Sequence, residues 1–174
     1  MKSNLLIVGA GLYGLVAKEI AESMGRFGKI GFIDDNAKIA PDGEKILGKF
    51  SDVKALCNEY DSVIVAIGNP DARLSMLEKL KNDNCLSIVT LISPLAYISP
   101  IADIAEGCII EPMAVVHTKC VISRGCIISA GAVVNHASVC EEGVHVDCNA
   151  TVVGYTIVPA KTKLMSGTVF SEKK

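Results

Sequence analysis

A period of six residues runs through the second half of the chain. From Ile98 to Phe170, thirteen positions recur at this spacing, and all except Cys140 and Phe170 are Ile, Val or Leu. The residue two places before each of them is never larger than Val. An uninterrupted hexapeptide period predicts a parallel β-helix, in which three hexapeptides form one coil of eighteen residues. The thirteen positions make a little over four coils, with the aliphatic and small side chains pointing into the bore.

Glycine recurs on the same period. A turn between short strands needs a backbone conformation that glycine adopts readily, and glycine is the residue expected there. Five glycines lie three places after an aliphatic position: Gly107, Gly125, Gly131, Gly143 and Gly167. They are predicted to be the turns between the strands of the coils.

The first half of the chain has a different pattern, in which apolar strands alternate with helices. Strands are predicted over residues 5–10, 29–34, 62–68 and 86–92, and helices over 12–24, after Ser51 and over 70–81. Ser51 and Asn69 are the predicted N-caps, and Pro70 is expected at the first helical position. This alternation is typical of a parallel sheet with crossover helices. The chain therefore divides into an α/β domain over 1–92 and a β-helix over 93–174.

Composition and charge exclude several classes of protein. Half of the residues are hydrophobic and the net charge is −2, which indicates a globular chain. The 17 basic residues are scattered, so no nucleic-acid partner is expected. The opening apolar stretch, 5–17, is too short to span a bilayer, so no membrane insertion is expected. The seven cysteines have neither C-x-x-C nor zinc-like spacing, which favours reduced thiols in a cytoplasmic protein without a metal site.

A glycine fingerprint follows the first predicted strand and opens the first predicted helix. Gly9, Gly11 and Gly14 have the G-x-G-x-x-G spacing, and Asp34 and Asp35 end the next strand. Glycines there allow a phosphate group to approach the helix N-terminus, while an acidic residue binds a ribose hydroxyl or a base edge. The alternative, a tight strand-to-helix turn that binds no ligand, stays open.

Gly68 and Asn69 end the third long strand and should lie at the same carboxyl edge of the sheet, where ligands of such folds bind. About ninety residues precede the repeats, which is too few for the second mononucleotide-binding half that a dinucleotide needs. The sequence thus favours a single nucleotide over NAD, and a nicotinamide oxidoreductase is the weaker alternative.

All three histidines lie in the predicted β-helix, and none occupies an inward position. His136 and His145 are nine residues apart, which is half a coil, so they are expected on opposite sides of the prism. A site that used both would therefore need prisms packed side by side in an oligomer. His117 has no such partner and is expected on the surface.

Most cysteines of the β-helix occupy inward positions and are expected to pack as small hydrophobic residues. These are Cys108, Cys120, Cys126 and Cys140. Cys148 faces outward, and a nucleophilic thiolate there remains an alternative to an inert side chain.

The motifs together resemble one known family. The segments IVGAGLYGLVAKEIAESMG, GFIDDN, VIVAIGN, LISPLAYISPIADIAEGCIIEPMAVV and AVVNHASV occur in this order over nearly the whole chain. They resemble the bacterial sugar O- and N-acyltransferases of the sialic acid O-acetyltransferase and bacillosamine N-acetyltransferase group (NeuD/PglD-like). The resemblance implies a Rossmann-like nucleotide-sugar domain followed by a left-handed β-helix. It also implies a homotrimer with active sites between subunits and acetyl-CoA as co-substrate.

The same resemblance assigns roles to individual residues. His136, in VVNHAS, matches the general base, and His145, in EGVHVD, matches a histidine that helps bind the acetyl thioester. Gly154 matches a glycine whose backbone borders the acyl donor. Ser129 falls where relatives often have a polar residue near the acceptor. Tyr13 stands in the fingerprint where a histidine is frequent.

Two departures from the family pattern affect these expectations. The base is commonly followed by an acidic residue, but here the next residue is Ala137. Asn135, Thr118 or water would then have to orient the imidazole. The repeats end at Phe170, so part of the usual channel for the pantetheine arm is expected to be missing.

The expected activity is direct acyl transfer from acetyl-CoA to an amino or hydroxyl group of a nucleotide-linked sugar. A UDP-amino sugar used in bacterial surface glycan biosynthesis is the expected acceptor. The alternative is a non-catalytic trimeric scaffold that binds a nucleotide and has lost the transfer activity.

Overall fold

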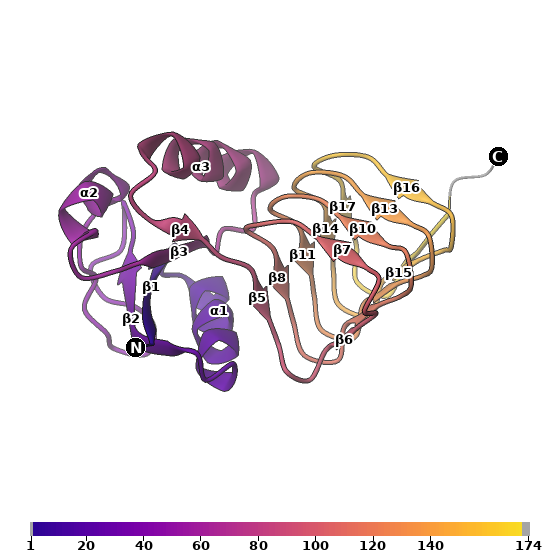
Figure 1. Ribbon diagram of the computed structural model, residues 1–174, viewed down its shortest axis with the longest axis horizontal. Helices are drawn as coiled ribbons and strands as arrows, with labels where there is room; N and C mark the ends of the chain where they lie inside the picture. The colour runs from indigo at the N-terminus through magenta and orange to yellow at the C-terminus, as the bar shows by residue number, and fades with distance from the viewer. Residues whose placement is uncertain (1, 172–174) are drawn as a thin grey trace. The chain divides into compact units, whose positions relative to one another are not determined.

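The computed structural model describes residues 2–171, which form two compact units with the boundary between Leu91 and Ile92 (Figure 1). The first unit is an α/β fold. Its elements, in chain order, are β1 (Ser3–Val8), α1 (Leu12–Ser23), β2 (Phe27–Ile33), the 3-10 turn η1 (Phe50–Asp52), α2 (Val53–Leu56), β3 (Ser62–Val65), α3 (Pro70–Asp83) and β4 (Ser87–Ile88).

The sheet of the first unit is parallel, with the strand order β2-β1-β3-β4. Helices α1 and α3 lie on its opposite faces (Figure 1), so both faces of the central strands are buried and their sequences are continuously apolar. After β2 the chain crosses back to the other side of β1. The carboxyl ends of β1 and β3 are thus neighbours at the point where the strand order reverses, which is where open α/β sheets bind ligands.

Of the two N-caps predicted in the first unit, one is confirmed. Asn69 is the N-cap of α3, where its side-chain oxygen accepts a hydrogen bond from the Ala72 N–H at 2.9 Å. The prediction of Ser51 as an N-cap is wrong, because Ser51 lies inside η1. The N-cap of η1 is Lys49, whose backbone N–H donates a hydrogen bond to the Asp52 carboxylate at 2.8 Å.

The apolar segment 86–92, predicted as one strand, is divided between the two units. Its first part is β4, which pairs with β3. Its second part, β5 (Leu91–Ile92), is the first strand of a β-helix sheet. Ile92 lies six residues before Ile98, so the hexapeptide period begins one step earlier than the sequence analysis placed it. An apolar run alone does not show where one sheet ends and the next begins.

The second unit is a left-handed β-helix built from two-residue strands. They are β5, β6 (Tyr97–Ile98), β7 (Asp103–Ile104), β8 (Ile109–Ile110), β9 (Val115–Val116), β10 (Val121–Ile122), β11 (Ile127–Ile128), β12 (Val133–Val134), β13 (Val139–Cys140), β14 (His145–Val146), β15 (Thr151–Val152), β16 (Ile157–Val158), β17 (Lys163–Leu164) and β18 (Val169–Phe170). They form three parallel sheets, one for each wall of the prism.

The register confirms the predicted coil of eighteen residues, because strands pair with residues eighteen apart, such as Ile127 with His145 and Val133 with Thr151. The aliphatic and small positions of the central coils are fully buried and form one continuous core. The turn position between walls has a φ between 56° and 73° from Gly107 to Gly167, whether or not it is glycine. The coil geometry therefore imposes the left-handed conformation on residues such as Ala137.

Apart from the half-buried Cys148, the cysteines divide into two groups. The four inward cysteines of the β-helix are buried, and burial raises the pKa of Cys140 to about 12, so this thiol stays protonated at neutral pH. The prediction of reduced thiols is wrong for Cys57 and Cys85, which form a disulfide. They are 28 residues apart, and only the packing of the α/β unit brings them together. Between residues 2 and 171, no helix is long and apolar enough to cross a membrane.

Candidate active site

The glycine fingerprint of the first unit contains two structural glycines and one that the fold does not require. Gly9 has a φ of 103°, and a Cβ atom there would lie 2.8 Å from the Ala66 carbonyl oxygen. A Cβ on Gly14 would overlap the Gly9 carbonyl oxygen. A Cβ on Gly11 would meet no atom within 4 Å, so the space beside the N-terminus of α1 is open. No side chain caps this helix N-terminus.

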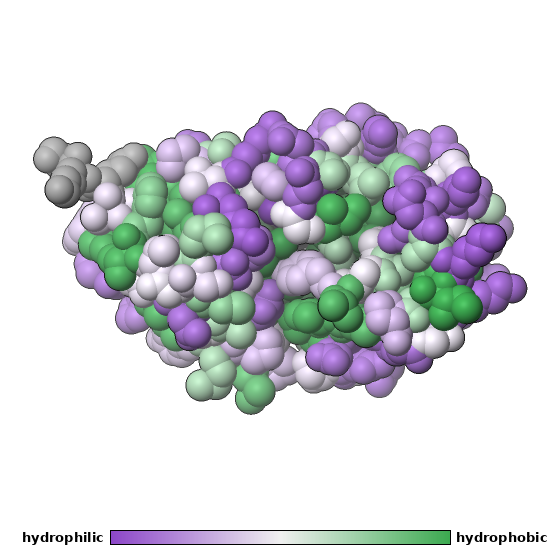
Figure 2. Space-filling model, turned by 180° about the vertical axis from the view of Figure 1, so that it is seen from behind, coloured by the Kyte–Doolittle hydropathy of each residue, from purple (hydrophilic) through white to green (hydrophobic). Residues whose placement is uncertain are grey.

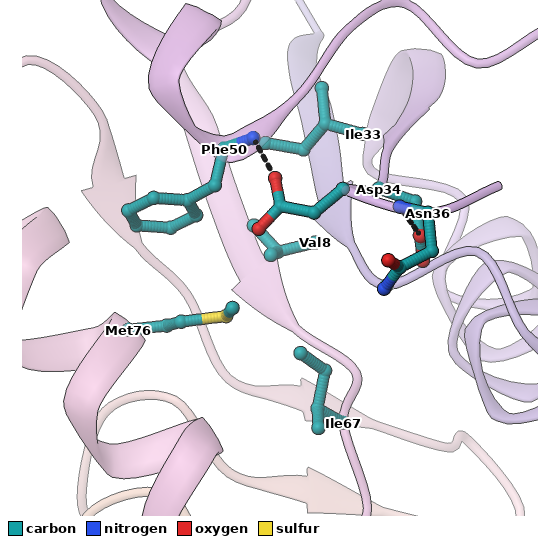
Figure 3. A pocket seen from close by; sticks show the side chains of 9 residues that line it. Val8, Ile33, Asp34, Asn36, Phe50, Ile67 and Met76 are labelled. Carbon is teal, nitrogen blue, oxygen red and sulfur yellow. Dashed lines mark hydrogen bonds between the residues drawn. The ribbon is translucent and has the colours of Figure 1, made fainter. Parts of the chain in front are cut away.

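A small cleft, partly open to solvent, lies at the carboxyl ends of β1, β2 and β3. Phe50, Ile67 and Met76 converge on it (Figure 3) and make one side apolar. Of the predicted nucleotide-binding residues, Gly9, Asp34 and Asp35 line this cleft. The others lie around it on the loops and helix ends: Gly11, the half-buried Tyr13, Gly14, Gly68 and Asn69.

The two aspartates of the cleft have different tasks. Asp34 accepts hydrogen bonds from the backbone N–H groups of Ala10, Asn36 and Ala37 at 2.8 to 2.9 Å, so it ties the glycine turn to the loop after β2. Asp35 accepts a hydrogen bond from the Phe50 N–H at its Oδ1, at 2.9 Å. The second oxygen of Asp35 is therefore better suited to a ligand than either oxygen of Asp34.

Asp34 should make the first unit sensitive to acid. Burial opposes its ionisation, but the three backbone N–H groups outweigh burial and hold the pKa of Asp34 below its usual value. A carboxyl group whose pKa is lower in the folded state stabilises the fold above its unfolded pKa of about 4, and this stability is lost as the pH falls further.

We expect Asp34→Asn to lower the free energy of unfolding at pH 7 by about 1–2 kcal/mol, because the amide retains one acceptor oxygen. The variant should lose less stability than the wild type between pH 5 and about pH 2, in urea unfolding followed by circular dichroism. Parallel pH dependences would contradict this role of Asp34.

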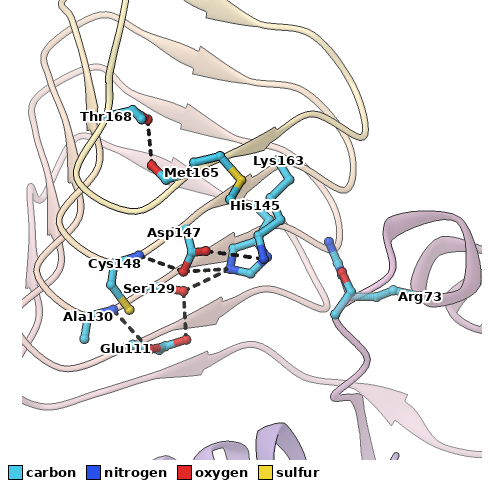
Figure 4. Close-up of polar contacts among 11 residues, drawn as sticks. Arg73, Glu111, Ser129, Ala130, His145, Asp147, Cys148, Lys163, Met165 and Thr168 are labelled. Atoms are coloured by element: carbon cyan, nitrogen blue, oxygen red, sulfur yellow. Dashed lines mark hydrogen bonds and ion pairs between the residues drawn. The ribbon is translucent and has the colours of Figure 1, made fainter.

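The second unit contains a buried chain of polar groups that ends at His145 (Figure 4). The Ser129 hydroxyl donates a hydrogen bond to Glu111 Oε1 at 3.0 Å and lies 3.0 Å from His145 Nε2. The second oxygen of Glu111 accepts the Ala130 N–H at 3.0 Å. His145 lies on the outer side of β14, as the register requires, but it is only 8% exposed rather than solvent-facing.

Glu111 belongs to this group of polar side chains but is not among the site residues predicted from the sequence. The signal was present, since Glu111, Ser129 and Asp147 each follow an aliphatic position by one residue and are eighteen apart. They are therefore neighbours on one wall of successive coils. Asp147 Oδ1 lies 3.9 Å from His145 Nε2, and its Oδ2 lies 3.3 Å from Lys163 Nζ.

Cys148, next to this cluster, does not have the environment of a nucleophilic thiolate. Its side chain is half-buried. Burial, followed by the nearby carboxylates of Glu111 and Asp147, raises the pKa of this thiol. A reactive cysteine needs the opposite electrostatic environment.

His136 lies on the turn after β12, in contact with three groups. Its Nδ1 is 2.8 Å from Asn135 Oδ1, and its ring packs edge to face against Tyr155 with the ring centres 5.1 Å apart. A Cβ on Gly154 would lie 3.0 Å from His136 Nε2, so a glycine is needed beside the ring. Asn135, one of the groups expected to orient the imidazole in place of an acidic residue, thus contacts the His136 ring at Nδ1. Ala137 occupies the left-handed turn position.

The three histidines are separated within the chain. His136 follows a strand of the sheet that contains β12, whereas His145 is part of β14 in another sheet. The His117 side chain is exposed and packs edge to face against the Tyr97 ring, with the ring centres 6.3 Å apart. Between residues 2 and 171, no group of three or more His, Cys, Asp or Glu side chains is placed to hold a metal ion.

Comparison with known proteins supports an acyltransferase. Residues 4–80 match the PglD N-terminal domain family. The acetyltransferase domain of PglB from Neisseria gonorrhoeae, solved with acetyl coenzyme A, is 28% identical, with a TM-score of 0.92 over 97% of this chain and 82% of that chain. No curated protein matches the chain.

Two more distant structures share the fold. Perosamine N-acetyltransferase from Caulobacter crescentus, solved with CoA and GDP-perosamine, is 19% identical, with a TM-score of 0.64 over 95% of this chain and 90% of that chain. WeeI from Acinetobacter baumannii is 16% identical, with a TM-score of 0.59 over 95% of this chain and 87% of that chain.

In its fold and in these matches, the chain is similar to sugar acetyltransferases of the hexapeptide-repeat class, which confirms the resemblance predicted from the sequence. The similarity to PglD covers the N-terminal part of the chain.

Proposed function

We propose that the protein transfers an acetyl group from acetyl-CoA to an amino or hydroxyl group of a nucleotide-linked sugar, with a UDP-amino sugar of surface glycan biosynthesis as the acceptor. The observation that carries this proposal is the similarity, over 97% of the chain, to an acetyltransferase domain solved with acetyl coenzyme A. The geometry of His136 and of the cleft in the first unit supports it.

His136 is the proposed general base. Its Nδ1–H donates to Asn135 Oδ1, which places the lone pair of the neutral ring on Nε2. Nε2 takes a proton from the sugar amine or hydroxyl as that group attacks the thioester carbonyl carbon. The resulting tetrahedral intermediate collapses by breaking the carbon–sulfur bond, and the proton passes from Nε2 to the departing CoA thiolate.

The oxyanion of the intermediate needs hydrogen-bond donors at fixed positions. The backbone N–H of Gly154 is the proposed donor, because Gly154 lies against His136 Nε2 and carries no side chain that would block the carbonyl. His145 is proposed to help hold the thioester group, and Ser129 to act through His145, with which it is in contact.

The nucleotide is proposed to bind the cleft of the first unit. Its phosphates would approach the uncapped N-terminus of α1 beside Gly11, where the backbone is open. The free oxygen of Asp35 would accept a hydrogen bond from the ribose or the base. The apolar side chains of Phe50 and Met76 would pack against the base.

A homotrimer is proposed because His136 and His145 lie on different walls of one prism. A site that uses both needs His136 from one copy and His145 from the next. Exposed apolar residues of the β-helix are available for such packing: Leu95, Tyr97, Ile101, Met113, Val153, Tyr155, Ile157, Met165 and Val169. Figure 2 shows hydrophobic patches, in green, on the surface of the molecule.

We expect sedimentation equilibrium at micromolar concentration to give about three times the chain mass of 18.3 kDa. A stable species of one chain mass would overturn both the trimer and the shared site.

The activity is tested by release of free CoA thiol from acetyl-CoA against a panel of UDP-, CMP- and GDP-linked amino sugars. The expected result is turnover with UDP-linked amino sugars, confirmed by the mass of the acetylated product. Binding of a nucleotide without turnover of any panel member would favour the non-catalytic scaffold.

A further inference from the structure

We propose that Glu111 and Ser129 are positioning residues that decide which ring nitrogen of His145 carries the proton. The tautomer is a property of the folded chain, and its consequence for the acyl donor rests on the proposed function.

The direction of the hydrogen bond between Ser129 and Glu111 follows from the two groups that contact the Glu111 carboxylate. A carboxylate has only acceptors, and its Oε2 accepts the Ala130 N–H, while its Oε1 accepts the Ser129 hydroxyl proton. The Glu111 and Ser129 side chains are nearly buried, at 7% and 2% exposed, so solvent competes little for the hydrogen bond between them.

The direction of the hydrogen bond between Ser129 and His145 follows from that between Ser129 and Glu111. A serine hydroxyl has one proton, and Ser129 uses it toward Glu111. The 3.0 Å contact between Ser129 Oγ and His145 Nε2 is therefore a hydrogen bond only if Nε2 carries a proton and donates it. Glu111 thus acts on His145 across two coils, through the hydroxyl between them.

The carboxylate of Asp147, which also lies near His145, does not set this proton. Asp147 Oδ1 is 3.9 Å from Nε2, beyond hydrogen-bond distance. Its carboxylate is held instead by the Cys148 N–H and by Lys163, which outweigh the effect of burial and keep the pKa of Asp147 low. Asp147 favours a positive ring through its charge, but it does not select one nitrogen.

The arrangement predicts an inversion in Glu111→Gln. The Ala130 N–H still needs an acceptor, so the glutamine oxygen should turn toward Ala130 and its NH₂ group toward Ser129. The Ser129 oxygen then accepts from the amide, and its proton turns toward His145 Nε2. A neutral ring can accept that proton only with its lone pair on Nε2 and its hydrogen on Nδ1.

The test is ¹⁵N NMR of the ring nitrogens in the full-length protein without substrates, since N–H and lone-pair nitrogens have separate shifts. The chain has three histidines, so His117→Gln and His136→Gln assign the signals. We expect a proton on Nε2 of wild-type His145 throughout the pH range, whether the ring is neutral or charged. We expect the Nδ1–H form in Glu111→Gln.

Glu141→Gln is the matched control. Glu141 Oε2 accepts the N–H of Ala160 at 2.9 Å, nineteen residues on, as Glu111 Oε2 accepts that of Ala130. Between residues 2 and 171, no histidine side chain is a hydrogen-bond partner of Glu141. This variant should leave the ring nitrogens of His145 unchanged. A wild-type ring with the lone pair on Nε2, or an unchanged tautomer in Glu111→Gln, would overturn the proposal.

Ser129→Ala covers the case in which Glu111→Gln does not fold. Without the hydroxyl, Ser129 no longer accepts a hydrogen bond from His145 Nε2, so a mixture of the two tautomers is expected. A pure Nε2–H ring in this variant would overturn the role of Ser129.

The kinetic consequence is tested separately. If His145 holds the donor, Glu111→Gln and Ser129→Ala should raise the KM for acetyl-CoA about tenfold and change the KM for the sugar much less. An inverted tautomer with unchanged kinetics would refute the use of His145 in donor binding but leave the tautomer control intact. An absence of turnover in the wild type would refute the proposed function and would not affect the NMR result.

Discussion

His136→Ala should lower kcat by about 10²- to 10⁴-fold, which is the usual contribution of a general base. The substitution removes the nitrogen that takes the proton from the sugar, while the bore residues beside it, such as Val134, keep their packing. The measurement is kcat at saturating acetyl-CoA and acceptor, under conditions where chemistry limits the rate.

His117→Ala is the matched control for this experiment. His117 stands on an equivalent turn of the β-helix, one residue after an aliphatic position, and is exposed. Its replacement should leave kcat and the oligomeric state unchanged. A His136→Ala variant that retained more than about half of the wild-type kcat would exclude His136 as the base.

Gly9→Ala should lower the free energy of unfolding of the α/β unit by about 3 kcal/mol. Gly9 has a φ of 103°, which strains any residue with a side chain, and the new Cβ would lie 2.8 Å from the Ala66 carbonyl oxygen. The oxygen belongs to the backbone that follows β3, so it cannot move aside without disturbing the sheet. Urea unfolding followed by the helical signal at 222 nm reports this unit, because α1, α2 and α3 all lie in it.

Gly11→Ala tests whether Gly11 is needed for ligand binding rather than for the stability of the fold. No atom lies within 4 Å of a Cβ at Gly11, and its φ of −80° is accessible to alanine. We expect a change in unfolding free energy of at most about 0.5 kcal/mol but weaker binding of the sugar nucleotide by calorimetry, since the methyl group enters the open space at the helix N-terminus. Equal stability losses in both variants would contradict the assignment of Gly9 as structural and Gly11 as ligand-facing.

The β-helix was predictable from the sequence because each of its coils repeats the same burial requirement. One aliphatic position in every six must enter the bore, and this requirement is local enough to appear along the chain without knowledge of any distant contact. Asn69 was predictable as a helix cap for the same reason, since its partner, Ala72, is three residues away. The glycine fingerprint also belongs to a single strand-to-helix turn.

Several features depended on contacts between distant segments. The run 86–92 is mostly apolar, and only the pairing partners of β4 and β5 divide it between two sheets. Cys57 and Cys85 meet because the α/β unit packs their segments together. Asp34 was predicted from the sequence to contact a ligand. In the structure, its oxygens accept hydrogen bonds from three backbone N–H groups.

By itself, the sequence determined the two architectures, the position of the repeats and which residues of the β-helix face inward, because these depend on periodic burial. Only the tertiary structure decided that Asn135 contacts the His136 ring and that Glu111 reaches His145 through Ser129. Side-chain direction and hydrogen-bond order depend on rotamers and on neighbours one or two coils away. A polar residue at an outward position has the same place in the period whether it meets solvent, a carboxylate or an imidazole, so the period alone does not distinguish these cases.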